Sequence, residues 1–190
     1  MILPIISYGN SVLKKKALPI SVKTKNLKSL IKDMWETMYA AQGVGLAAPQ
    51  IGKSIRLFIV DTYPFSENED LSINERNFLK TFKKVFINPE IVEENGNECV
   101  FNEGCLSIPG IREDVKRKDS IIIKFQDSNG KFIKESFSGI AARVIQHEYD
   151  HIEGILFTDK LSYLKKKTIK RKLTEISTGK IKVDYSMKFL

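Results

Sequence analysis

The chain has 190 residues, of which 42% are hydrophobic and 28% are charged, and a chain of this size can bury a core of its own. The first residues, MILPIISYGN, show no basic leader before an apolar run, and no apolar stretch reaches the roughly 18–20 residues that cross a bilayer. Two cysteines are too few for a disulfide scaffold. We therefore expect one domain over residues 1–190, without a membrane partner, in the reducing cytoplasm.

The net charge of +8 is distributed unevenly along the chain. Ten Lys or Arg residues lie from Lys160 onward, where Glu175 and Asp184 are the acidic residues, and residues 1–159 carry no net charge. The positive charge therefore belongs to the C-terminal segment, and we expect no binding to free DNA.

A first helix is predicted from Asn26, as its N-cap, to about Gln42. The apolar residues at helical spacing that predict it are Leu27, Leu30, Ile31, Met34 and Met38. The loop GVGLAAPQIG follows, and then IRLFIV at 55–60 predicts a strand. Residues 64–82 are polar and without periodicity, which predicts a surface insertion.

Short strands are predicted next, at 85–87 and 91–92 on either side of Pro89. Two more, at 121–125 and 132–137, flank the sequence DSNG, which is a strong signal for a hairpin. These segments predict a small antiparallel sheet.

Two further helices are predicted in the last third of the chain. One runs from residue 140 to about 152, with Ser138 as its N-cap and Gly154 as its stop. The other is basic, from 161 to about 176, and the alternation in 180–190 indicates an edge strand. The predicted fold class is α+β, with small antiparallel sheets around a central metal-binding helix, an N-terminal helix and a C-terminal basic helix with its tail (161–190).

The sequence HEYDH lies on the predicted central helix. His147 and His151 are four residues apart, which places both imidazoles on one face of a helix, one turn apart, where they can bind a single ion. They are the only histidines of the chain. Glu148 adjoins the first of them and can act as a general base on a water at the metal.

A catalytic site of this type needs a third protein ligand and one open position. A third histidine in the metzincin pattern is excluded, because that position is Phe157. Cys105, in EGCLSIPG, is the remaining candidate, while Glu175 stays open as the third ligand of a gluzincin-like protease. Cys99 lies in a strand-like run and is expected to be a buried hydrophobic residue outside the site.

Three segments resemble peptide deformylases, in the order that this family has them. They are GVGLAAPQ (43–50), EGCLS (103–107) and QHEYDH (146–151), and the similarity extends over most of residues 4–165. The resemblance implies hydrolysis of the formyl group on the N-terminal methionine of nascent peptides, with release of formate. It also implies one divalent metal, Fe²⁺ in most deformylases, which Zn²⁺, Ni²⁺ or Co²⁺ can replace.

Carried over motif by motif, the resemblance also assigns roles to single residues. The implied metal ligands are Cys105, His147 and His151, and the implied acid and base is Glu148. Gln50 and the backbone N–H of Leu106 would stabilise the oxyanion. The substrate pocket would include Gly43, Val44, Gly45 and Val144.

Residues beside these motifs carry weaker predictions. Glu103 and Gln146 flank the ligands and are expected to orient them by hydrogen bonds. Arg143 is expected to line the mouth of the site or to pair with a carboxylate, and Asp150 to be a structural or solvated carboxylate.

The basic C-terminal helix suggests docking on the ribosome, whose RNA attracts Lys and Arg in a salt-dependent way. Two other functions remain open at this stage: a zincin-like endopeptidase and a non-catalytic ribosome-associated protein that uses the metal structurally. Three good ligands without a fourth favour an open, catalytic site over a structural one.

Overall fold

The computed structural model describes residues 1–190 and contains four α-helices and seven β-strands. The helices are α1 (Leu27–Ala40), α2 (Ile73–Thr81), α3 (Gly139–Ile152) and α4 (Tyr163–Ser177). The strands are β1 (Ile5–Ile6), β2 (Gly45–Ala47), β3 (Leu57–Asp61), β4 (Lys83–Cys105), β5 (Ile108–Gln126), β6 (Phe132–Ser138) and β7 (Met187–Lys188). None of the helices combines the length and the apolar character that a membrane span requires.

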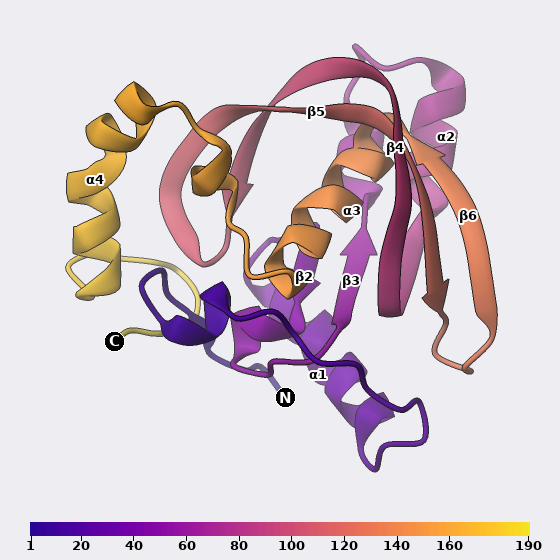
Figure 1. The fold of residues 1–190 in the computed structure, drawn as a ribbon, viewed down its shortest axis with the longest axis horizontal. Helices are drawn as coiled ribbons and strands as arrows, with labels where there is room; N and C mark the ends of the chain where they lie inside the picture. Colours follow the sequence, from indigo (N-terminus) through magenta and orange to yellow (C-terminus); the bar gives the residue numbers. More distant parts are fainter.

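Five strands form one antiparallel sheet in the order β2-β3-β4-β5-β6, and β1 and β7 form a separate pair. The α+β class is therefore confirmed. The expectation of antiparallel pairing throughout is wrong for the second sheet, because β1 and β7 run parallel. In Figure 1 the long strands β4 and β5 arch across α3, and α4 lies at the opposite end of the molecule from β6.

Strand β3 is apolar on both faces because both faces are covered. Phe58 and Val60 belong to the cluster that contains the buried side of α3, while Leu57 and Ile59 belong to the cluster formed with α1. Successive side chains of a strand point to opposite faces, so α1 and α3 lie on opposite faces of the sheet. The metal-binding helix predicted at 140–152 is thus the buried α3.

Residues 85–87 and 91–92 are strand as predicted, but the break expected at Pro89 is wrong, because both segments belong to the single strand β4. The register against β5 shifts between Ile87 and Glu90, so Pro89 lies in an irregularity of the ladder where its missing N–H costs no hydrogen bond. Asn88 adopts a positive φ of 50° at this point. The predicted hairpin is confirmed: β5 pairs with β6 across the turn that Asp127 and Gly130 form.

Residues 64–82 are not irregular throughout, since they contain α2. Ser72 caps this helix by accepting a hydrogen bond from the N–H of Glu75, and the pair fits the S-x-x-E pattern of helix starts. Leu79 and Phe82 are buried in the main core, so the segment contributes to the packing of the domain.

Asn26 and Ser138 occupy the predicted N-cap positions, but the capping hydrogen bond is absent at both. Asn26 precedes α1 in a left-handed conformation. The predicted stop of α3 is confirmed at Gly154, which follows the helix with a φ of +75° that favours glycine.

The basic helix α4 packs on the molecule through Ile169, Leu173 and Ile176. Leu164 is also apolar, but it is 73% exposed and does not pack with these three residues. The edge strand expected along 180–190 is reduced to the two residues of β7, which pair with β1 at the start of the chain.

Candidate active site

Two imidazoles project from the buried part of α3 toward one point. The rings of His147 and His151 lie 5.1 Å apart between centroids, as expected for positions one helical turn apart. His151 is 1% exposed.

Cys105 is brought to the histidines by the end of β4. A two-residue turn, Leu106-Ser107, follows it, and Cys105 pairs with Ile108 of β5 across that turn. Its Sγ lies 3.3 Å from Nε2 of His151, and the ligating atoms of Cys105, His147 and His151 all lie within 4.8 Å of one another. One thiolate and two imidazoles at this spacing fit a single divalent ion and leave one coordination position open.

A buried carboxylate connects β4 to this cluster. Oε2 of Glu103 lies 2.9 Å from Nδ1 of His147, and both of its oxygens accept hydrogen bonds from Arg117, at 2.7 and 2.9 Å. Arg143 donates a further bond to Oε1 at 2.9 Å, and Arg117 also pairs with Asp150 at 2.6 Å. All of these groups except His147 are at least nine-tenths buried.

The charge of Glu103 fixes the tautomer of its histidine partner. Burial alone would raise the pKa of Glu103, but the hydrogen bonds from Arg117 and His147 outweigh it and hold that pKa well below its ordinary value. An ionised carboxylate only accepts, so Nδ1 of His147 carries the proton and Nε2 is left free to bind an ion.

Glu148 lies in the opposite electrostatic environment. It is buried, and its Oε2 has no hydrogen-bond partner. Burial raises the pKa of this carboxyl to about 7, which is the range where a general base is effective. A Cβ at Gly45 would overlap the carboxylate of Glu148, so β2 can pass this close only with glycine there.

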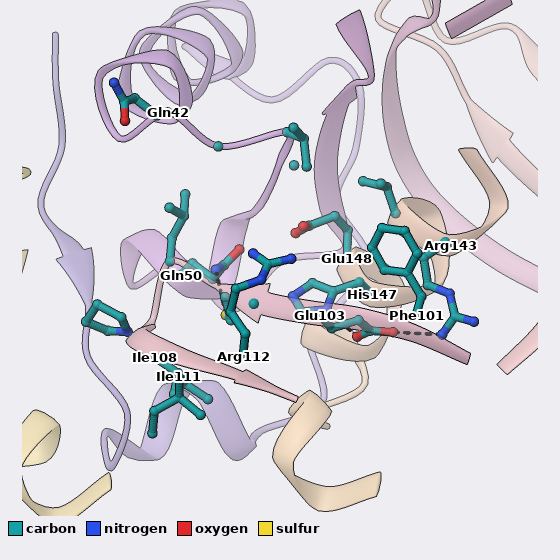
Figure 2. A pocket seen from close by; sticks show the side chains of 18 of the residues that line it. Gln42, Gln50, Phe101, Glu103, Ile108, Ile111, Arg112, Arg143, His147 and Glu148 are labelled. Carbon is teal, nitrogen blue, oxygen red and sulfur yellow. Dashed lines mark hydrogen bonds and ion pairs between the residues drawn. The ribbon is translucent and has the colours of Figure 1, made fainter. Parts of the chain in front are cut away.

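The side-chain amide of Gln50 faces the same space. Its Oε1 accepts a hydrogen bond from the N–H of Ala47 at 2.8 Å, which turns Nε2 toward Cys105 and Ser107, at 3.5 and 3.4 Å. Figure 2 shows the side chains of Gln50 and Glu148 pointing into one cavity.

This cavity has a volume of about 530 Å³. Every sequence-predicted catalytic, metal-binding or pocket residue lines it except His151, which is almost fully buried. Residues that the sequence did not point to also line it, among them Phe65, Phe101, Arg112 and Tyr185.

Comparison with known proteins identifies this arrangement. The family model described as polypeptide deformylase matches residues 2–167. The chain belongs to the peptide deformylase family. Deformylases are metal-dependent enzymes that remove the formyl group from the N-terminal methionine of nascent peptides.

Individual deformylases are similar to this chain over most or all of its length. The peptide deformylase of Christiangramia forsetii is 59% identical over 189 residues, which are 100% of this chain and 96% of that protein. The crystal structure of a deformylase from Legionella pneumophila is 40% identical and superposes with a TM-score of 0.77, covering 92% of this chain and 95% of that one. A deformylase from Acinetobacter baumannii with Met-Ala-Ser bound is 34% identical, with a TM-score of 0.75 over 85% of this chain and 99% of that one.

Several weaker sequence predictions are settled by the contacts. Glu103 contacts a histidine as expected, and Arg143 pairs with that carboxylate. Gln146 does not reach the ligands, because its amide donates to the carbonyls of Lys118 and Ala142. The gluzincin reading is wrong, since Glu175 lies on α4 outside the cluster of ligating groups.

Two smaller predictions concern residues near the site. From the sequence, Asp150 is expected to be either structural or solvated. It is structural, because it pairs with Arg117 and Lys160. Cys99 lies outside the cluster, but it is half-buried and its Sγ accepts a bond from Arg143 at 3.0 Å, so it is not a plain buried hydrophobic residue.

Arg117 is the central cation of the buried ion network that Glu103, Asp150 and Arg143 form with it. Its removal should destabilise the protein. Arg117→Met removes the bidentate partner of Glu103 and the closest cation of Asp150, and leaves only Arg143 and His147 beside Glu103 and Lys160 beside Asp150. Two buried carboxylates then lack much of their compensating charge, and we expect the free energy of unfolding to fall by about 3–5 kcal/mol. Urea denaturation measures it. As the control, Lys165→Met removes an exposed ion pair with Glu113 and should leave the midpoint unchanged. Equal midpoints for the Arg117→Met variant and the unmodified chain would contradict the structural role of the network.

Proposed function

We propose that this chain hydrolyses the formyl group of N-terminal formyl-methionyl peptides and releases formate. The observation that carries the proposal is the unpartnered oxygen of Glu148, buried in the cavity beside Cys105 and His147. A buried acceptor without a donor is costly in a folded protein unless a ligand or substrate supplies the donor. A reacting water fits this position.

One divalent ion per chain would be held by Cys105, His147 and His151. When bound, it would supply Lewis acidity that lowers the pKa of a water from about 15.7 towards 7. The hydrogen bond between Nδ1 of His147 and Glu103 orients the imidazole of His147 and raises the basicity of its Nε2. These residues leave the cavity side of the cluster open, which suits catalysis rather than a structural role.

We propose Fe²⁺ as the native ion, since a thiolate ligand suits iron as well as zinc, nickel or cobalt. An iron–thiolate pair at the wall of an open cavity is prone to oxidation, so activity should decay in air and persist longer with Ni²⁺ or Co²⁺. Elemental analysis of protein purified without oxygen should find about one iron per chain. Stoichiometric zinc and no iron under those conditions would overturn this choice.

Glu148 would move the proton during hydrolysis. Its carboxylate takes a proton from the attacking water and returns it to the departing amine of methionine. Negative charge develops on the formyl oxygen as the water adds, and the amide of Gln50 with the N–H of Leu106 would stabilise it. One such donor typically contributes roughly 3–4 kcal/mol.

The methionine side chain would occupy the apolar part of the cavity. Val44 and Val144 contribute side chains to its wall, and the backbone of Gly43 and Gly45 lies along it. The thioether of methionine is flexible and polarisable, and it packs well against such surfaces.

Formate release from formyl-Met-Ala-Ser tests the proposed reaction. Glu148→Gln keeps the shape of the side chain but removes the base, so kcat should fall by about 10²–10⁴ with the metal content unchanged. Cys105→Ser should lose the metal, whereas the matched change Cys99→Ser should keep it. Release of amino acids from unblocked Met-Ala-Ser, without formate from the formyl peptide, would favour the endopeptidase instead.

We propose further that α4 docks the enzyme on the ribosome, in the cytoplasm, where nascent chains emerge. Lys167, Lys170 and Lys172 are exposed on a helix whose apolar side is already packed on the protein. Ribosomal phosphates would attract these cations in a salt-dependent manner.

Charge removal tests the docking. Replacing Lys167, Lys170 and Lys172 by Gln should weaken ribosome binding at least tenfold and lower the slope of log Kd against log salt by about 2. The same replacement at Lys23, Lys25 and Lys28, which are exposed near α1, should leave binding unchanged. Equal losses in both triple variants would point to unspecific attraction and reject α4 as the docking element.

A further inference from the structure

The tail after α4 returns to the active site. Residues 178–190 follow Ser177, turn at Gly179, and end in the β7 strand that pairs with β1. The N–H groups of Ile5 and Ser7 donate to the carbonyls of Ser186 and Lys188, at 2.9 and 3.0 Å. This segment lies outside residues 2–167, which the family model matches.

Tyr185, just before these bonds, contacts the turn that carries Cys105. Its hydroxyl donates to the carbonyl oxygen of Leu106 at 2.7 Å, across 79 residues of sequence. The side chain is partly buried and also lines the cavity. A tyrosine hydroxyl has an ordinary pKa of about 10, so it keeps its proton at neutral pH and remains a donor.

The turn makes few other contacts. Nε2 of Gln50 lies 3.4 Å from Oγ of Ser107, and the side chain of Leu106 packs against the cluster formed with α1. The N–H of Tyr8 donates to the carbonyl of Ser107 at 2.8 Å, and Tyr8 follows directly on β1 and Ser7. The N–H of Leu106 donates to no group of the chain, which leaves it available for the developing oxyanion. The Leu106 carbonyl has Tyr185 as its one donor. The tail therefore holds the turn directly through Tyr185 and indirectly through β1.

We propose that Tyr185 is a positioning residue for the deformylase reaction. It fixes the Leu106-Ser107 turn, and with it the direction of the Leu106 N–H and the place of Cys105. This inference rests on the proposed roles of Leu106 and Cys105. It makes the C-terminal tail part of the active-site architecture, although the tail supplies no group that reacts.

Tyr185→Phe tests the proposal because it removes the hydroxyl and keeps the packing of the ring. In the full-length, metal-loaded protein we expect kcat for formyl-Met-Ala-Ser to fall about three- to tenfold, with KM within twofold, since the oxyanion donor is less well aligned. Tyr163→Phe, on an exposed ring of α4, is the matched control and should change neither constant. A Tyr185→Phe variant with unchanged kcat would overturn the proposal, whether or not its KM rises.

A second measurement does not depend on activity. In the zinc-loaded protein the NMR order parameter of the Leu106 amide should fall in Tyr185→Phe, from about 0.85 towards 0.6, because the turn loses its anchor. An unchanged order parameter would overturn the positioning role. If the unmodified enzyme released no formate, the proposed function would fail, while the order parameter would still decide whether Tyr185 holds the turn.

Discussion

The contact between Glu103 and His147 joins the two parts of the structure that must meet at the site. Cys105 stands at the end of a strand, whereas both histidines stand on a helix, and no local sequence feature brings a strand end to a helix face. The carboxylate of Glu103, two residues before Cys105, contacts His147 and is held in turn by Arg117 and Arg143. Burying these charged side chains is costly when any partner is missing. Their contacts therefore favour a single placement of β4 relative to α3.

Two buried carboxylates at one site serve different purposes because their surroundings differ. Glu103 receives hydrogen bonds from two arginines and a histidine and stays ionised, which suits the orientation of a ligand. Glu148 has an oxygen without a partner, and burial raises its pKa to about 7, which suits proton transfer. Pairs of titratable groups whose environments push their pKa values apart are characteristic of acid and base assignments in enzymes.

The elements and site residues that the sequence predicts correctly are those with a local signal. Helical spacing placed His147 and His151 on one face, and the DSNG turn located the hairpin of β5 and β6. Prediction from the sequence failed at Pro89, because a ladder irregularity that admits proline depends on the partner strand. The α2 helix was missed although Ser72 and Glu75 form a readable helix start, since the segment lacks a clear apolar stripe.

Long-range contacts at the site could not be read from the sequence. Arg117 looks like any basic residue of a strand, and only the fold reveals that it binds Glu103 and Asp150. Tyr185 reaches Leu106 across most of the C-terminal half of the chain, and its position in the alternating tail predicted only an edge strand.

X-ray absorption of the zinc-loaded protein tests most directly the central claim, that β4 and α3 together form an open three-ligand metal site. We expect one sulfur at about 2.3 Å and two imidazole nitrogens at about 2.0–2.1 Å from the zinc, with a light atom from solvent in the fourth position. Cys105→Ser should retain no zinc after dialysis, and zinc added to it in excess should show no sulfur neighbour, whereas Cys99→Ser should keep the sulfur. A shell of four protein ligands, or one without sulfur, would contradict the account.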